Sequence, residues 1–164
     1  MRVYLATTMS GLGELLAAGS LDVPAGHAVT PALREWYVEG DAEELEYAAL
    51  TVAARASLRL LAGEPSARPR RVVLAAEVPD GSVRPAPDVD RAAVRLTGPV
   101  PISAVVSAHV DDVSAEQDVR RGAAALAGAD AGDEDSQFVV DDVEDHELGW
   151  YAAQEIGVLL ELET

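Results

Sequence analysis

The chain has 164 residues, no cysteine, and 29 acidic against 12 basic side chains, for a formal net charge of −17 at pH 7. This length is typical of one domain with a substantial core, so we expect a single domain over residues 1–164. The missing cysteines exclude disulfides, thiolate nucleophiles and cysteine-ligated metals.

The negative charge is concentrated in the last third of the chain. Residues 111–147 hold thirteen acidic side chains and two arginines, a net charge of −11. A field of this sign repels nucleic acids and anionic membranes, and it attracts cations or basic protein surfaces. We therefore expect no nucleic-acid or membrane partner, and a basic protein partner for the segment 111–147.

The first residues, MRVYLA, carry one charge and only a short apolar run, unlike a secretory signal peptide. No stretch reaches the ~18 apolar residues that a transmembrane helix needs. We therefore expect a cytosolic location.

The N-terminal pattern predicts a strand followed by a helix. Val3–Ala6 is apolar and partly β-branched, as in a buried strand. Ser10 is a suitable N-cap for a short helix, and Gly19 is a suitable terminator. Residues 20–29 contain proline and glycine and are expected to form a loop.

Two further helices are predicted next. Thr30 followed by Pro31 is a typical helix start. Asp41 and Glu44 have the spacing of a capping box, and apolar residues at helical spacing continue to about Ala62. The second of these helices is the longest in the prediction.

The middle of the chain predicts three strands. The apolar run Val72–Val78 is typical of a central strand that is covered on both faces. Residues 79–92 contain three prolines and are expected to form an exposed loop. Residues 94–97 alternate as in a half-buried strand, and residues 107–111 indicate another strand.

The C-terminal third predicts two helices. Ser114 and Gln117 form a second capping box, for a helix that ends at Gly128. The last helix is expected to run from about Asp142 to Leu162, with acidic residues in its first turn.

These elements predict an α+β domain in which a small mixed β-sheet of about four strands is covered by three or four helices. The irregular order of strands and helices argues against a doubly wound parallel sheet. A ferredoxin-like variant with inserted helices is the alternative.

Two histidines stand beside acidic residues. On a strand, His109 and Asp111 point to the same face, and the predicted last helix carries His146 and Glu147. If these segments meet, the four side chains suit zinc, manganese or iron. The simpler alternative is that His146 packs on Trp150 at the edge of the core and that the acids cap a loop.

No phosphate-binding glycine loop, dinucleotide-binding fingerprint, nucleophile elbow, HExxH motif or kinase signature is present. The favoured hypothesis is therefore a non-enzymatic interaction or regulatory protein that uses its acidic segment. The alternative is a metal-dependent enzyme, such as a hydrolase, that uses the His/Asp/Glu set with a divalent metal.

Five segments together resemble a small uncharacterised family of actinobacterial proteins, and the resemblance spans nearly the whole chain. The resemblance implies no activity, cofactor, partner or functional residue. The segments are MRVYLATT, TPALREWYVEGDAEELEYAAL, RRVVLAAEVPD, AHVDD and DHELGWYAAQE.

Overall fold

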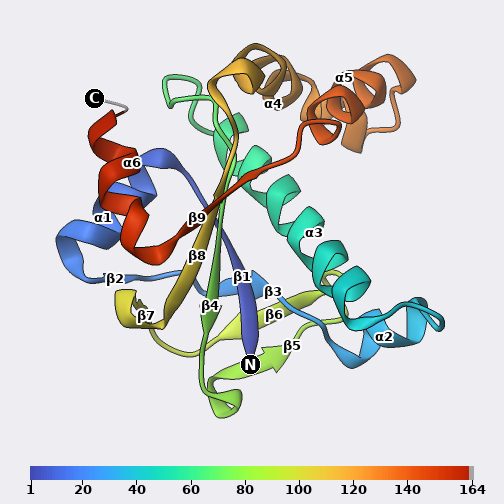
Figure 1. Ribbon diagram of the computed structural model, residues 1–164. Helices are drawn as coiled ribbons and strands as arrows, with labels where there is room; N and C mark the ends of the chain where they lie inside the picture. Colours follow the sequence, from blue (N-terminus) through green and yellow to red (C-terminus); the bar gives the residue numbers. More distant parts are fainter. Residues whose placement is uncertain (163–164) are drawn as a thin grey trace.

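Helices lie on both faces of a seven-stranded sheet in the computed structural model, which describes residues 1–162 (Figure 1). The strand order is β5-β6-β3-β1-β4-β8-β9, and β2 pairs with β7 in a separate ribbon. The strands are β1 (Arg2–Thr7), β2 (Ser20–Leu21), β3 (Ala25–His27), β4 (Val72–Glu77), β5 (Val83–Pro85), β6 (Ala93–Leu96), β7 (Val100–Pro101), β8 (Val105–Val110) and β9 (Gly149–Ala152). The helices are α1 (Met9–Ala18), α2 (Pro31–Trp36), α3 (Ala42–Ala62), α4 (Glu116–Asp130), α5 (Glu134–Glu144) and α6 (Ile156–Leu162).

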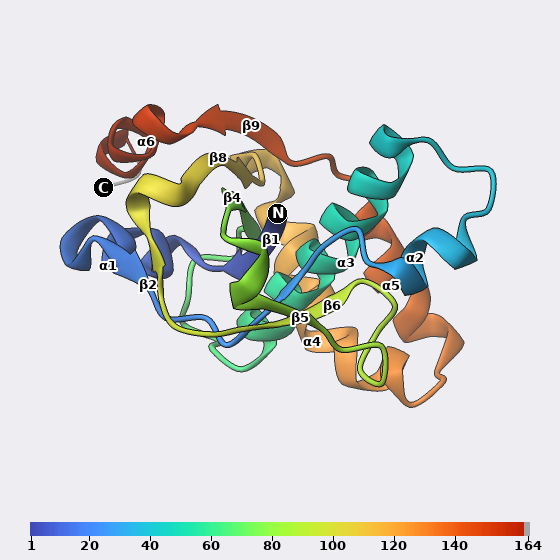
Figure 2. The ribbon, with the colours of Figure 1, turned by 90° about the horizontal axis from the view of Figure 1, so that it is seen from below.

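The central strand β4 is buried on both faces, which confirms the interpretation of its apolar run. Its side chains alternate between two cores, because successive residues of a strand point to opposite faces. Val72 and Leu74 pack with α1 and α6, whereas Val73 and Ala75 pack under α3. Figure 2 shows α1 and α6 on one side of these strands and α3 on the other.

A third core joins the α4–α5 hairpin to the C-terminal half of α3. Leu58 of α3, Leu126 of α4 and Val143 of α5 are all buried there. The two helices of the hairpin approach closely at Gly122, where a methyl group would overlap the side chain of Val143. Because the hairpin packs on the last turns of α3, it lies beyond the sheet, at one end of that helix (Figure 1).

Several predicted helix ends are confirmed. Thr30 and Asp41 accept hydrogen bonds from backbone N–H groups three residues on, and they begin α2 and α3. Gly19 ends α1 with a left-handed φ of 76°, a conformation that favours glycine. The N-cap of α1 is Thr8 rather than Ser10.

The sheet is larger than predicted. It has seven strands instead of about four, and every pairing within residues 1–162 is antiparallel instead of mixed. The strands that the sequence does not reveal, such as β3 and β5, are three residues long and contain glycine or proline. Residues 1–162 form six α-helices, of which α1 and α6 pack on one face of the sheet and α2 and α3 on the other, in agreement with the predicted three or four covering helices. Helices on both faces depart from a ferredoxin-like arrangement, which has them on one face.

The predicted last helix is wrong. Residues Glu134–Glu144 form α5, Gly149–Ala152 form the edge strand β9, and α6 begins only at Ile156. His146 and Trp150 therefore do not share a helix face. The capping box at Ser114 is also wrong, because Asp112 caps this turn and α4 continues past Gly128 to Asp130.

The described residues form one α+β domain, and the last two residues of the predicted span 1–164 lie outside them. No helix within residues 1–162 has the length and apolar character needed to cross a membrane.

Candidate functional site

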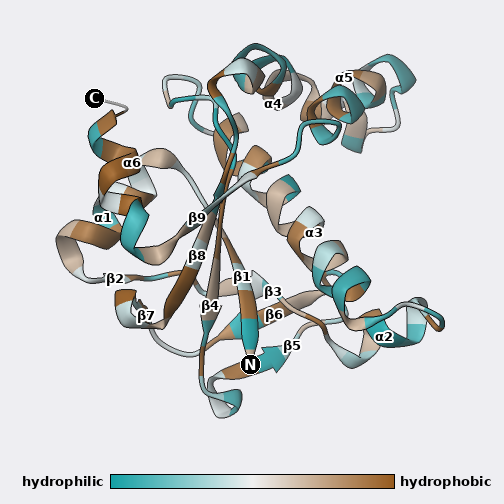
Figure 3. Ribbon diagram, in the orientation of Figure 1, coloured by the Kyte–Doolittle hydropathy of each residue, from teal (hydrophilic) through white to brown (hydrophobic). Residues whose placement is uncertain are grey.

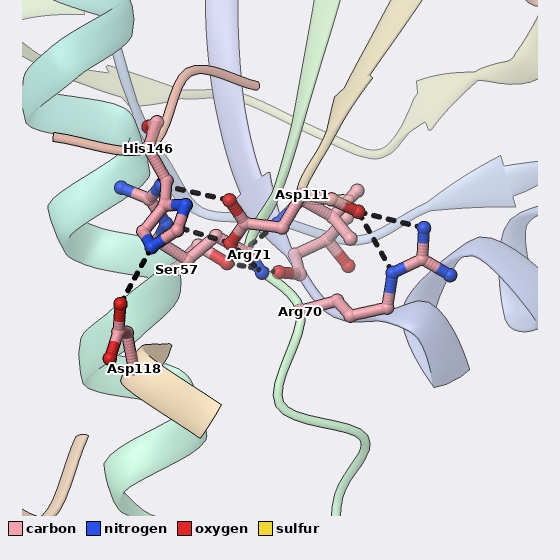
Figure 4. Close-up of polar contacts among 8 residues, drawn as sticks. Ser57, Arg70, Arg71, Asp111, Asp118 and His146 are labelled. Atoms are coloured by element: carbon pink, nitrogen blue, oxygen red, sulfur yellow. Dashed lines mark hydrogen bonds and ion pairs between the residues drawn. The ribbon is translucent and has the colours of Figure 1, made fainter. Parts of the chain in front are cut away.

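A buried ion pair lies where β4 begins and β8 ends. Because these strands pair antiparallel, with Val72 opposite Val110, the residues Arg71 and Asp111 become neighbours. Two 2.8 Å hydrogen bonds join the Arg71 guanidinium to the Asp111 carboxylate, one from Nε to Oδ2 and one from Nη2 to Oδ1 (Figure 4). Asp111 is 0% exposed. The aspartate is therefore the counterion of an arginine.

Neighbouring polar groups extend this cluster to β1 and α3. Arg70 donates from Nε and Nη2 to the main-chain oxygen of Asp111, at 2.9 and 2.7 Å. The buried Ser57 hydroxyl of α3 donates to Thr7 O at 2.7 Å and accepts from Val72 N at 3.0 Å. The cluster thus ties α3 to three strands, and its geometry is that of a structural anchor.

His146 lies in the segment between α5 and β9, beside this cluster. Its main-chain oxygen accepts a 2.9 Å hydrogen bond from Arg71 Nη2. Its Nε2 lies 2.8 Å from Asp118 Oδ2 of α4 (Figure 4). The hydrogen bond from His146, followed by that from Arg121, holds the pKa of Asp118 below its usual range. The imidazole therefore tethers the hairpin to the sheet edge.

His109 lies near the C-terminal end of β8, opposite Trp150 of β9. Its Nε2 lies 3.2 Å from the hydroxyl of the buried Ser107. Burial, and then the positive charge of Arg2, lower the pKa of His109, so the imidazole is neutral at pH 7. A neutral imidazole can accept the Ser107 proton in a hydrogen bond, which satisfies this buried hydroxyl.

The side chains of the four predicted metal ligands have different partners. Arg71 binds both Asp111 and the main chain of His146, His109 contacts Ser107, and Glu147 lines a small hollow with His146. No three His, Asp or Glu side chains of the described residues are arranged to hold a metal ion. Metal binding by His109, Asp111, His146 and Glu147 stays a prediction.

The two arginines of the cluster, Arg70 and Arg71, were not among the predicted site residues. The available signal was Arg70-Arg71 directly before the most apolar strand, because charged residues at the end of a buried strand need counterions. Sequence alone does not reveal that Asp111 supplies this charge, since it leaves the pairing of β4 with β8 open.

Many acids of the segment 111–147 lack a counterion. Five of them pair with arginine or histidine, namely Asp111, Glu116, Asp118, Asp130 and Glu144. The others are exposed and form no ion pair within residues 1–162, namely Asp112, Asp133, Glu134, Asp135, Asp141, Asp142, Asp145 and Glu147. Most of these lie on α5 or at its two ends. Figure 3 shows long hydrophilic stretches there and in the segment that leads to β9.

An aromatic side chain lies among these acids. Phe138 of α5 is 67% exposed. Glu134, Asp135, Asp141 and Asp142 lie three or four residues from it on either side, so they share its helix face. The opposite face of α5 carries the buried Val140 and Val143. The exposed face of α5 is thus an aromatic ring surrounded by uncompensated carboxylates.

Comparison with known proteins identifies a family. One family model, described as a family of unknown function, matches residues 1–160. No curated protein and no solved structure matches the chain. The expected membership of an uncharacterised family is therefore confirmed: the chain belongs to the family of unknown function DUF6912.

Proposed function

We propose that this protein is a non-catalytic interaction or regulatory module whose acidic segment 111–147 binds a basic surface of another protein. The observation that carries the proposal is the exposed face of α5, where Phe138 is surrounded by four carboxylates without counterions. Aromatic residues are typical anchors of protein interfaces, and an acidic field steers a basic partner toward them. Lysine and arginine fit such a face, since their apolar stems cover a ring while their charged heads meet carboxylates.

Helix stability does not account for all of this charge. Glu134 and Asp135 lie in the first turn of α5, where acids interact favourably with the helix dipole. Asp141 and Asp142 lie near the C-terminal end, where the dipole disfavours negative charge. These two acids therefore oppose the stability of their own helix, which supports a role in binding.

The proposal is tested by fluorescence anisotropy with an amphipathic peptide of lysine and leucine and its glutamate analogue. We expect the lysine peptide alone to bind, with an affinity that falls as salt is added. Replacing the ring in Phe138→Ala should weaken binding by about fivefold or more. Val158→Ala, which truncates a half-exposed side chain on α6, is the matched control and should have no effect.

Equal binding of the two peptides would contradict the proposal. So would equal losses in Phe138→Ala and Val158→Ala, because the aromatic residue of α5 would then have no special role.

No observation within residues 1–162 favours the metal-dependent hydrolase over the interaction module. It stays the alternative prediction. A cytosolic location, an actinobacterial origin and the absence of a nucleic-acid partner also stay predictions.

A further inference from the structure

A hollow of about 800 Å³ lies between α2 and the exposed face of α3, at the opposite end of α3 from the α4–α5 hairpin (Figure 1). Three aromatic residues line it: Trp36 and Tyr37 at the end of α2, and Tyr47 of α3. Trp36 and Tyr47 are 61% and 62% exposed. Large aromatic rings with this exposure are unusual for a surface that only faces water.

The chain places one of its own arginines on an aromatic wall of this hollow. The guanidinium carbon of Arg91 lies 3.7 Å from the centroid of the Trp36 ring. Planar guanidinium groups stack on aromatic faces through cation–π attraction. The Arg91–Trp36 contact shows that the wall accepts this group.

A second ring lies beside acids that no arginine neutralises. Glu43 and Glu44 precede Tyr47 by four and three residues on α3, so the three side chains share one face. Within residues 1–162 neither glutamate forms an ion pair, and no cation lies over the Tyr47 ring. The Tyr47 ring offers a stacking surface, and the carboxylates of Glu43 and Glu44 offer charged hydrogen-bond acceptors. Proteins recognise guanidinium groups through these two kinds of contact.

The charge of the lining favours one more cation. Glu43, Glu44 and Asp90 bring three negative charges to the hollow, and Arg91 is its one positive side chain among the lining residues. The net charge of −2 offsets the repulsion that Arg91 exerts on a second guanidinium.

We propose that this hollow binds an arginine side chain of a partner protein. The guanidinium stacks on Tyr47, and Glu43 and Glu44 accept its hydrogen bonds. Arginine is preferred to lysine because its planar fork stacks and donates at the same time. None of these residues lies in the segment 111–147, so the inference stands independently of the proposed function.

The two tryptophans of the chain allow a direct test by NMR. Trp36 lines the hollow, and Trp150 lies on β9, so their indole N–H signals report on two different surfaces. The probe is the capped peptide Gly-Ser-Arg-Gly-Ser, with lysine and citrulline versions as controls. We expect the arginine peptide to shift the Trp36 signal saturably, the lysine peptide to bind about fivefold more weakly, and the neutral citrulline peptide to have no effect.

Variants test whether Tyr47 and the carboxylates of Glu43 and Glu44 bind the peptide. Tyr47→Ala should weaken binding of the arginine peptide about fivefold or more, whereas Tyr47→Phe keeps the ring and the affinity. The double variant Glu43→Gln with Glu44→Gln should also weaken binding. Phe138→Ala should leave it unchanged, which separates this site from the acidic face of α5.

Three results would overturn the inference. The first is an equal shift by the citrulline peptide, and the second is a shift of the Trp150 signal in place of Trp36. The third is wild-type binding by Tyr47→Ala. Because Tyr47 is exposed, this variant should keep the fold, and the same spectra check that it does.

Discussion

At the scale of single residues, the chemistry of Asp111 depends on which strand lies beside β8. The alternation of the strand correctly predicts that His109 and Asp111 share a face. It does not predict that β4 is the strand beside β8. This pairing brings Arg71, which directly precedes β4, to both carboxylate oxygens of Asp111. Sequence spacing therefore identifies candidate ligands along one strand, whereas long-range pairing decides whether they are free to act.

Loss of the buried arginine should be costly, because it leaves the charge of Asp111 buried without its partner. We expect Arg71→Met to lower the free energy of unfolding by about 3–5 kcal/mol. Arg121→Met removes an ion pair at the surface, with Asp118, and should cost no more than about 1 kcal/mol. Urea denaturation measures both, and a similar small loss for the two variants would contradict the structural role of the cluster.

Two partly buried histidines make stability depend on pH. Burial lowers the pKa of His27 and His109 below the ordinary value of about 6.5, so the unfolded chain binds protons more readily than the folded one. The free energy of unfolding should therefore fall as the pH drops below about 6.5 toward the folded pKa values.

The variant His109→Gln tests this origin, because glutamine does not titrate. Denaturation curves between about pH 7 and pH 5 should show a smaller pH dependence for His109→Gln than for the wild type. An unchanged slope would mean that His109 does not contribute.

At the scale of elements, the helices α2 and α3 were predictable from their caps, and the short strands were not. The last predicted helix rested on Leu148, Ala152 and Ile156, which have helical spacing. In the structure Leu148 packs on the α3 side of the sheet and Ile156 on the α1 side. A helix with one apolar face would bury both residues in the same core, whereas the edge strand β9 lies between them and lets them reach opposite faces of the sheet. The pairing with β8 is a long-range interaction that local periodicity does not contain.

The α4–α5 contact requires a glycine. Gly122→Ala should lower the free energy of unfolding by about 1–3 kcal/mol, because its methyl group overlaps Val143 in a packed core. Gly13→Ala on α1 is the matched control, since a methyl group there meets no atom within 4 Å. This control should gain about 0.5–1 kcal/mol from the better helix propensity of alanine. Equal effects of the two substitutions would contradict the close approach of the helices.

At the scale of the whole molecule, the pattern of predicted elements indicated the α+β class and the charge distribution revealed the acidic segment, which the structure divides into two parts. Acids such as Asp130 and Glu144 bind arginines of α3 and hold the hairpin in place. The acids around Phe138 have no counterion among the described residues. Net charge alone does not separate the two groups, because the arginines that neutralise the first group lie far away in the sequence.

The predicted metal site has a clear test in the unfolding midpoint. A metal at 100 times its dissociation constant would add about 2.7 kcal/mol to the free energy of unfolding. We expect zinc and manganese to leave the midpoint of chelator-treated protein unchanged, because Asp111 is bound to Arg71 and His146 to Asp118. A shift that both His109→Ala and His146→Ala abolish would contradict this expectation and favour the metal-dependent enzyme.

The most direct test of the acidic face on α5 compares two variants of equal net charge. Glu134→Gln with Asp142→Asn neutralises two acids beside Phe138, and Glu14→Gln with Asp22→Asn neutralises the same two residue types elsewhere. We predict that the α5 variant weakens binding of the lysine–leucine peptide about tenfold and that the control loses less than about twofold. Equal losses in the two variants would show that the peptide responds to net charge alone, and the proposed binding surface would be wrong.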